Sequence, residues 1–333
     1  MNTDVLKYDV VAIGECLIDF VSRKDKGENK LLLEGNAGGA PANVLAMASR
    51  LGLKTAFISK IGQDGFGDFL KDTLEKAGID TRKMIVTDEY PTTLAFVTLD
   101  DTGNRSFAFY RNRTADVMLE EHELDYNEIA KAKIFHFGSV SMSKEPSRTA
   151  TLKAAEYAHR QGLMVSYDPN LREPLWNSLQ EAKEVMLKGM QYADAVKVSD
   201  EELIVLAGVS DVEQAMEILF EKYNLKLLAV TLGANGCICR CKNGIFRAQT
   251  FDFACVDTTG AGDAFWGACL YWMIKNNKEL DDYTAQDMAE LMDFANAAGS
   301  LATTQKGAIP AMPTKQQILD CIATMPRCRL QGI

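Results

Sequence analysis

The sequence predicts an α/β sandwich, in which helices cover both faces of a mostly parallel central sheet, with a small β-lid beside it. Short apolar runs alternate with amphipathic segments over most of the 333 residues, which is typical of βα units that feed a parallel sheet. The apolar runs are rich in Val, Ile, Leu and Phe, as strands covered on both faces are. Two regions break this rhythm and favour antiparallel ribbons.

The elements of the main sheet follow from the apolar runs. We expect strands at residues 8–14, 54–61, 133–142, 163–168, 193–198 and 226–232. Helices are expected between them. Residues 41–51 begin with a proline and end before Gly52, and residues 66–77 end before Gly78, which matches the preference for Pro in the first turn of a helix and Gly after its last.

The two ribbons have different expected places. Residues 93–112 predict a hairpin, because a Gly-containing turn separates two alternating runs. With residues 15–35 this hairpin is expected to form the lid, so that the lid segments are approximately 15–35 and 90–112. The ribbon at 236–250 is expected to extend the main sheet. No linker rich in Pro, Ser or Gly divides the chain, and we expect residues 1–333 to form one domain.

Composition excludes several classes of protein. The net charge of -10 and the lack of a basic stripe argue against a nucleic-acid partner. No stretch approaches the length of apolar residues that a membrane span needs, and the start lacks the pattern of a secretory signal. Cys237, Cys239 and Cys241 alternate without zinc-like spacing. We interpret them as reduced packing thiols of a cytoplasmic protein.

The strongest chemical signal is the run Asp257-Thr-Thr-Gly-Ala-Gly-Asp263, which leads directly into an apolar helical segment. A Gly-rich turn that opens a helix presents N–H groups and the positive end of the helix dipole, so it favours an anion. The groups concerned are those of Gly260, Ala261 and Gly262. Asp263 is either a cap of this helix or a general base beside the anion.

A second signal is Asn36-Ala-Gly-Gly-Ala-Pro-Ala-Asn43, again just before a helix. Gly38 and Gly39 permit a ligand to approach the backbone, and Asn43 offers both a donor and an acceptor to a polyol. The alternative is an ordinary loop with a cap. Asp19, expected near the end of the first strand, could accept two sugar hydroxyls, because open α/β sheets bind ligands at the carboxyl ends of their strands.

Three other enzyme classes lack their motifs in this chain. A P-loop kinase needs Gly-Lys in its phosphate loop, and the chain has no Gly-Lys dipeptide. A dehydrogenase of the dinucleotide-binding type needs Gly-x-Gly-x-x-Gly after the first strand, but Glu-Cys-Leu follows Gly14. The Gly-x-Ser-x-Gly of a serine hydrolase is also missing.

The two glycine-rich motifs, in this order and separation, resemble the signatures of the ribokinase-type (pfkB) carbohydrate kinase family. The resemblance runs from about residue 8 to 325. Within the family the chain most resembles fructokinases, through four further stretches: Gly14-Glu-Cys-Leu-Ile-Asp19, Phe109-Tyr-Arg111, Tyr167-Asp-Pro-Asn-Leu-Arg172 and Lys197-Val-Ser-Asp-Glu-Glu202. It implies a ribokinase-like three-layer α/β/α sandwich and ATP-dependent phosphorylation of a sugar, first of all D-fructose to fructose 6-phosphate.

The resemblance also implies roles for individual residues. Asp263 takes the proton of the sugar hydroxyl, and the N–H groups of the turn before it hold the transferring phosphoryl group. The sugar lies beneath the lid. Its expected contacts are Asp19, Gly38, Gly39 and Asn43, with Arg111 and Arg172 nearby. Unpaired lid edges also favour a homodimer formed through the lid.

The nucleotide and metal ions have implied positions too. The residues that correspond to the ATP site are Ser199, Thr231, Gly233, Gly236, Asn296, Gly307 and Ala308. Glu202 is expected to order Mg²⁺ through water. Asp257, Thr259 and Ala302, with Gly307, correspond to a K⁺ site in some members. Ser199 stands where the wider family usually has Asn.

Two alternatives stay open. The chain could phosphorylate another sugar or sugar acid, such as 2-keto-3-deoxygluconate or ribose. It could also be a regulatory protein that keeps the kinase fold without turnover.

Overall fold

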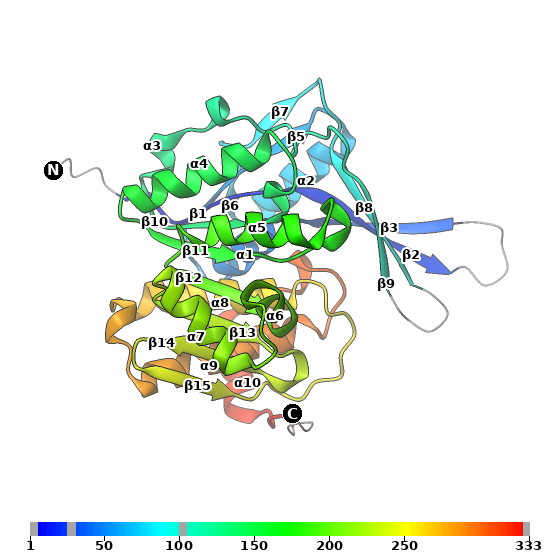
Figure 1. Ribbon diagram of the computed structural model, residues 1–333. Coiled ribbons are helices and arrows are strands. Elements are labelled where there is room, and N and C mark those ends of the chain that lie inside the picture. Colours follow the sequence, from blue (N-terminus) through cyan, green and yellow to red (C-terminus); the bar gives the residue numbers. More distant parts are fainter. Residues whose placement is uncertain (1–5, 25–30, 100–104, 329–333) are drawn as a thin grey trace.

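The computed structural model describes residues 6–24, 31–99 and 105–328 (Figure 1). Over these residues the main sheet has nine strands in the order β15-β14-β13-β12-β11-β10-β1-β4-β6. Neighbouring strands are parallel from β13 to β6, and only β14 and β15 are antiparallel additions. The mostly parallel sheet is therefore confirmed, as is its extension by the second ribbon. The strands are β1 (Tyr8–Ile13), β4 (Thr55–Ile58), β6 (Ile79–Asp80), β10 (Ala132–Gly138), β11 (Met164–Asp168), β12 (Ala195–Ser199), β13 (Leu227–Thr231), β14 (Cys237–Cys241) and β15 (Gly244–Ala248).

Helices cover both faces of this sheet because its strands are apolar on both sides. In β1, Val10 and Ala12 belong to one core cluster, and Val11 and Ile13 belong to the other. The first core is closed by α1 (Ala40–Arg50), α8 (Ala261–Asn276) and α9 (Ala285–Ala302), with α10 (Lys315–Thr324) at its edge. The second, nearer the viewer in Figure 1, is closed by α4 (Ser147–Arg160), α5 (Leu179–Met190), α6 (Asp200–Ala207) and α7 (Val212–Tyr223).

Two more helices and six 3₁₀ turns lie among the described residues. They are α2 (Gly65–Lys76), α3 (Tyr126–Ile129) and the 3₁₀ turns Glu121–Glu123, Val140–Met142, Glu173–Leu175, Gly233–Asn235, Leu280–Asp282 and Ile309–Ala311.

A separate four-stranded sheet, in the order β3-β2-β8-β9, projects from this body (Figure 1). It consists of β2 (Leu17–Lys24), β3 (Leu31–Gly38), β8 (Thr93–Leu99) and β9 (Arg105–Tyr110). These strands come from the two segments that the sequence assigns to a lid, and β8 and β9 form the expected hairpin pair. Residues 25–30 and the expected hairpin turn at 100–104 lie outside the described residues.

The two faces of the four-stranded sheet differ in character. Asp19 stands opposite Asn36 and Ala95 in neighbouring strands, so these residues share one face. The other face carries an aromatic row. Phe20 stacks on Phe96 (5.2 Å between ring centroids), and Phe96 meets Tyr110 edge to face (5.1 Å).

Three expectations from the sequence need correction. The run at 54–61 is two strands, because β4 ends at Ile58 and β5 (Lys60–Gly62) pairs with β7 (Ile85–Thr87) in a separate sheet. The run at 133–142 is a strand only to Gly138, and residues 140–142 form a buried 3₁₀ turn. An apolar run shows burial but does not distinguish a strand from a buried turn. Asp19 lies inside β2, not at the end of β1.

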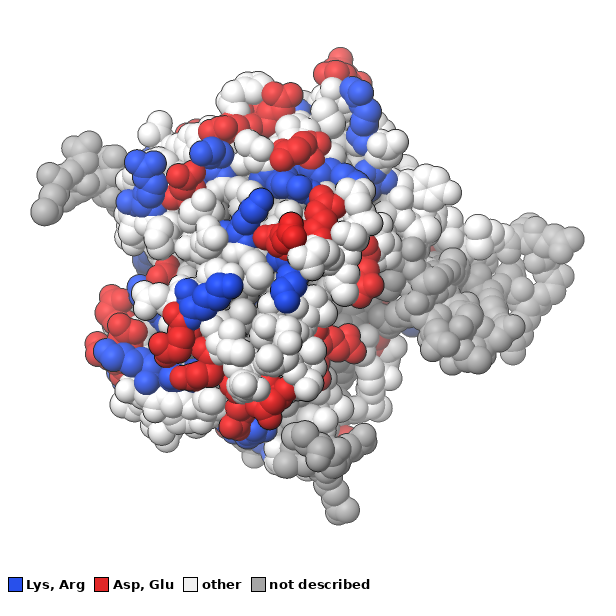
Figure 2. Space-filling model, viewed as in Figure 1, with Lys and Arg blue, Asp and Glu red and all other residues white. Residues whose placement is uncertain are grey.

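Two further expectations concern the surface and the cysteines. Within the described ranges, no helix is both long and apolar enough to cross a membrane. The three alternating cysteines of β14 are free and buried in the first core, which confirms them as packing thiols. On the face shown in Figure 2, basic and acidic side chains are interspersed.

Candidate active site

The two glycine-rich motifs meet through one hydrogen bond. Asn43 lies in the first turn of α1 and Asp263 in the first turn of α8, and the Asn43 side-chain amide donates to Asp263 Oδ2 over 2.8 Å. The two helices can approach because residue 267 is glycine. A Cβ there would lie 2.7 Å from the Val44 carbonyl oxygen. The motifs are 220 residues apart in the chain, and the fold brings them to one point.

Asp263 is not the cap of α8. The N-cap is Gly260, whose φ of 77° is left-handed and suits glycine. No side chain caps this helix. The turn packs tightly, since a Cβ on Gly260 would lie 2.6 Å from the Ala308 Cβ. The Ala261 N–H donates to the Thr258 carbonyl (3.2 Å), so this amide would have to exchange partners to bind an anion.

The carboxyl of Asp263 is buried, and its surroundings tune its basicity. Burial raises its pKa above the ordinary value, while the positive charge of Lys197 and the bond from Asn43 oppose this rise. Arg172 also lowers the pKa and Glu202 raises it. A carboxyl with a raised pKa is a stronger base once it is ionised.

Lys197 and Asp168 form a buried ion pair beneath the turn that carries Asp263. The Lys197 Nζ donates to Asp168 Oδ2 over 3.0 Å, and the side chains are 8% and 0% exposed. A Cβ on Gly262 would lie 3.0 Å from the same Nζ. Burial raises the pKa of Asp168 to about 7, although the Lys197 charge opposes it. Sequence reasoning gave neither residue a role, although a lysine inside the apolar strand run 195–199 is a signal that could have found it.

Two of the expected sugar contacts, Asp19 of β2 and Gly38 of β3, lie on the same face of the four-stranded sheet. A Cβ on Gly38 would lie 2.2 Å from Asp19 Oδ2, so only glycine leaves room for that carboxylate. Burial raises the pKa of Asp19 to about 6, with Arg172 lowering it and Asp263 raising it. The charges of Asp19, Arg172 and Asp263 therefore act on one another across a common space.

The two predicted arginines are placed differently. Arg111 is 2% exposed, and its Nε donates to Asp116 Oδ2 (2.7 Å) while its Nη1 donates to the Ser143 hydroxyl (2.7 Å). Its Nη2 has no hydrogen-bond partner among the described residues and is available to a ligand. Arg172 is half-buried, and its Nη1 donates to the Leu171 carbonyl (3.1 Å).

Ser199 and Glu202 hold the start of α6. The Ser199 hydroxyl accepts from the Glu202 N–H (3.1 Å), and Glu202 Oε2 accepts from the Ser199 N–H (2.8 Å). The other oxygen, Oε1, accepts from the Leu171 N–H (2.6 Å). These residues form a capping box, so the structure gives both a local structural role.

The remaining residues of the expected nucleotide site come from the end of β13, two loops and α9. Thr231 stands beside Ser199 in the β12–β13 pair. Gly233 begins a 3₁₀ turn and Gly236 follows its last residue, and a Cβ on Gly236 would lie 2.0 Å from the Ala248 carbonyl oxygen. The Asn296 amide reaches the Ala248 and Gln249 carbonyls at 3.4 Å.

The loop of Asp257 is tied to the loop of Gly307. Asp257 Oδ1 accepts from the Thr259 N–H (3.0 Å), and its Oδ2 accepts from the Gly307 N–H (3.1 Å). The Asp257 N–H donates to the Thr303 carbonyl (3.1 Å), next to Ala302. The structure thus brings together all four residues expected at a K⁺ site.

Unpaired polar atoms concentrate in this region. Seven buried side-chain polar atoms lack a hydrogen-bond partner among the described residues. Four belong to the residues around the two motifs: Glu15 Oε2, Asn43 Oδ1, Arg111 Nη2 and Asp168 Oδ1. Such atoms are rare in native proteins without a ligand or water. Three of them are acceptors, which a ligand rich in hydroxyl groups would satisfy.

Comparison with known proteins identifies the family. The model of the pfkB family of carbohydrate kinases matches residues 7–315. This chain belongs to that family. The kinase is 44% identical over 314 residues to probable fructokinase-2 of Arabidopsis thaliana, which covers 93% of this chain and 94% of that protein.

Solved structures of fructokinases are also similar to the kinase. The fructokinase of Xylella fastidiosa with bound ATP has a TM-score of 0.88 and 33% identity, over 95% of this chain and 99% of that one. A double mutant of the Vibrio cholerae fructokinase, bound to fructose, ADP and a potassium ion, has a TM-score of 0.84 and 31% identity, over 96% and 100%.

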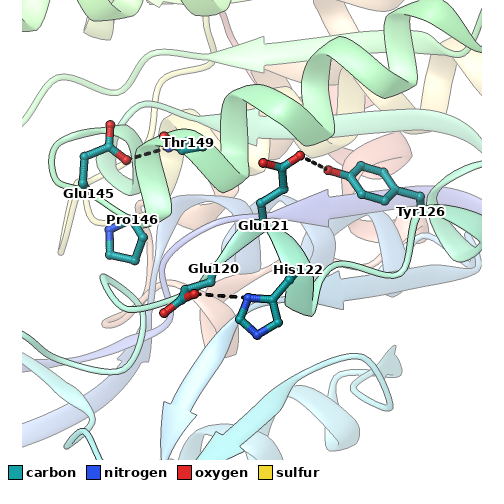
Figure 3. Close-up of a pocket in the computed structure, with 7 residues that line it drawn as sticks. All are labelled: Glu120, Glu121, His122, Tyr126, Glu145, Pro146 and Thr149. Atoms are coloured by element: carbon teal, nitrogen blue, oxygen red, sulfur yellow. Dashed lines mark hydrogen bonds and ion pairs between the residues drawn. The ribbon is translucent and has the colours of Figure 1, made fainter.

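A pocket of about 570 Å³ lies apart from these residues, beside α3 and α4 (Figure 3). Its lining is acidic: Glu120, Glu121, His122, Tyr126, Glu145, Pro146 and Thr149. The polar groups largely satisfy one another, as His122 pairs with Glu120 (3.1 Å) and Tyr126 donates to Glu121 (3.3 Å). We assign no role in the reaction to this pocket.

Proposed function

We propose that this kinase transfers the γ-phosphoryl group of ATP to D-fructose and forms fructose 6-phosphate. One contact supports the proposal most directly, the bond from Asn43 to Asp263, because it joins a sugar-type loop to a carboxylate at an anion-binding turn. We choose ATP and D-fructose as the substrates because similar fructokinases bind them. The Xylella fastidiosa structure contains ATP, and the Vibrio cholerae structure contains fructose and ADP.

Asp263 is the proposed general base. Its carboxylate accepts the proton of the sugar hydroxyl while the hydroxyl oxygen forms a bond to the γ-phosphorus. The bond from that phosphorus to the β–γ bridging oxygen breaks, and ADP leaves. N–H groups of Gly260, Ala261 and Gly262 stabilise the charge on the transferring group. The base supplies about 10²- to 10⁴-fold of the rate, and positioning supplies much of the rest.

Asp19 and Asn43 would orient the sugar. Asp19 has two carboxylate oxygens on the face of the lid that points toward Asp263, and Asn43 Oδ1 is a buried acceptor without a partner. Sugar hydroxyls donate to such acceptors. Gly38 and Gly39 let the sugar approach the backbone, and Arg172 with the Nη2 of Arg111 supplies donors.

Nucleotide and metal ions would lie on the α6, α8 and α9 side. Each oxygen of Glu202 accepts one backbone N–H, so a lone pair on each remains for a water bound to Mg²⁺. Mg²⁺ neutralises phosphate charge when it is bound. Ser199, Thr231, Gly233, Gly236, Asn296, Gly307 and Ala308 would line the ATP site, and K⁺ would lie at Asp257, Thr259 and Ala302.

The lid would exclude water, which competes with the sugar for the phosphoryl group. Its outer face is apolar, with Tyr110 67% and Leu31 73% exposed beside the aromatic row. Such a face favours pairing with a second copy, and we place the homodimer contact there. The free thiols fit a reducing compartment such as the cytoplasm.

A panel of sugars tests the proposal. We expect ADP release with ATP and Mg²⁺ to be fastest, by kcat/KM, with D-fructose. A better rate with ribose or 2-keto-3-deoxygluconate would contradict the choice of sugar. ATP binding without turnover on any sugar would support a regulatory protein.

A further inference from the structure

Glu15 lies where the chain passes from the main sheet into the four-stranded sheet, between β1 and β2. It is 3% exposed, and its Oε1 accepts from the N–H of Ala40, the first residue of α1, over 2.9 Å. That helix has no side-chain cap from its N-cap Gly39 and no acidic residue in its first turn. Glu15 therefore provides the acceptor that this helix N-terminus otherwise lacks.

The backbone around Glu15 packs directly on the same end of α1. Gly39 has a φ of 116°, and a Cβ on it would lie 2.3 Å from the Glu15 carbonyl oxygen. A Cβ on Gly14 would lie 2.6 Å from Cγ of Pro41. With no space between the two segments, the position of one fixes the position of the other.

The other connections of the four-stranded sheet reach the same place. Arg111 directly follows β9 and pairs with Asp116, and Asp116 also accepts from the hydroxyl of Thr93 at the start of β8. Burial raises the pKa of Glu15 to about 7, while the charge of Arg111 lowers it and that of Asp116 raises it. We call Glu15, Thr93, Arg111 and Asp116 the hinge cluster, because they lie at or next to the connections of β2, β8 and β9 with the rest of the fold.

Two hydrogen bonds and one turn of α1 connect Glu15 of the hinge cluster with Asp263. Glu15 holds Ala40, and Asn43 follows Ala40 by three residues in the same helical turn. Asn43 in turn donates to Asp263. We propose that Glu15 is a positioning residue for phosphoryl transfer, which holds the N-terminus of α1 so that Asn43 stays on Asp263. This inference rests on the proposed role of Asp263 in the kinase reaction.

Two measurable effects follow from the loss of the Glu15 carboxylate. A misplacement of about 1 Å near the reacting groups costs about 10²-fold in rate, so Glu15→Ala should lower kcat by about 10- to 100-fold. Because the Asn43 bond lowers the pKa of Asp263, its loss should raise that pKa. The acid limb of the kcat/KM profile should then move to higher pH, as it should in Asn43→Ala.

A double-mutant cycle tests whether Glu15 acts through Asn43. The variants are Glu15→Ala, Asn43→Ala and the two together, measured with fructose, ATP and Mg²⁺. We expect the double variant to be no slower than Asn43→Ala, within about twofold, because one contact cannot be lost twice. A double variant whose loss of kcat equals the product of the two single losses would overturn the proposal. A Glu15→Ala enzyme with unchanged kcat and an unchanged acid limb would also overturn it.

Glu15→Gln separates positioning from folding. It keeps an oxygen that can accept from the Ala40 N–H, so it should retain about tenfold more activity than Glu15→Ala. If Glu15→Ala does not fold, the cycle is run with Glu15→Asp, whose shorter side chain withdraws the acceptor from the Ala40 N–H, and a double variant whose loss of kcat is the product of the two single losses again overturns the proposal. Asp211→Ala is the matched control, since Asp211 caps the remote helix α7 by accepting from Gln214. It should lower stability and leave the pH profile unchanged.

Failure of the proposed function would be visible separately. A parent enzyme that does not phosphorylate fructose contradicts the choice of substrate, and the cycle is then run with the best sugar of the panel. If the proposed role of Glu15 is wrong, the parent enzyme still phosphorylates fructose, and only the kcat and pH profiles of the variants differ from the expected ones.

Discussion

At the scale of single residues, the pH dependence should report the charge state of Asp263. A base must be ionised, so kcat/KM should fall as the pH drops through its raised pKa. The Lys197 charge lowers that pKa. Replacing Lys197 by Met should therefore move the acid limb to higher pH, and a pH–rate profile with fructose measures the shift.

This substitution leaves Asp168 buried without its partner, which can destabilise a protein by about 3–5 kcal/mol. The double variant Lys197→Met with Asp168→Asn removes both charges and serves as the folded alternative. Lys226→Met is a suitable control, because Lys226 pairs with Asp194 at the opposite end of the strands. An acid limb that moves to lower pH in Lys197→Met would contradict the electrostatic account.

At the scale of elements, the register of β2 and β3 places Gly38 against the Asp19 carboxylate, so substitution of Gly38 tests the sugar site. In Gly38→Ala the new Cβ would lie 2.2 Å from Asp19 Oδ2, so the carboxylate must move. We expect the KM for fructose to rise by about tenfold or more, with little change in the KM for ATP, since a misplaced contact weakens binding of its own substrate.

Gly65→Ala provides the control for that experiment. Residue 65 begins α2, and a Cβ there meets nothing within 4 Å. Helix propensity makes Ala neutral or slightly stabilising there. Equal increases in the two KM values of Gly38→Ala would show a general disturbance and contradict a sugar-side role for Asp19.

The outer face of the four-stranded sheet makes a prediction about assembly. Leu31 is 73% exposed on that face, and Leu31→Asp should weaken a dimer formed there, because it places a charge in an apolar contact. Analytical ultracentrifugation should then show about half the mass of the parent at equal concentration. A parent that is already monomeric would contradict the proposed dimer.

At the scale of the whole molecule, the loops of Asp257 and Gly307 should make activity depend on a monovalent cation. Their hydrogen bonds close a ring of oxygen-bearing groups beside the turn at Gly260. We expect replacement of choline by K⁺ to increase kcat. The same rate in both salts at constant ionic strength would contradict the K⁺ site.

Local patterns in the sequence predicted much of this molecule. The positions of most strands along the chain, the ribbon at 236–250 and the turn before Asp263 are short-range features, because apolar runs and glycines mark them directly. The family was recognisable from the same motifs. The boundaries failed where an apolar run continued through a turn, as at Gly138 and Ile58.

Contacts between distant segments were not predictable from local patterns. Nothing near Asn43 in the sequence indicates that its amide reaches Asp263, and nothing near Glu15 indicates that it holds Ala40. These contacts depend on how α1, α8 and the four-stranded sheet pack together. The alternative of a helix cap for Asp263 could be set aside only when the structure identified Gly260 as the N-cap.

The most direct test of the account is Asp263→Asn, which keeps the shape of the side chain and removes its basicity. We predict that kcat with fructose falls by about 10²- to 10⁴-fold, the usual share of a general base. ATP affinity, measured by calorimetry, should change by less than about threefold, because the proposed nucleotide contacts do not include the Asp263 carboxylate. An Asp263→Asn enzyme that turns over at the parent rate would contradict the central claim.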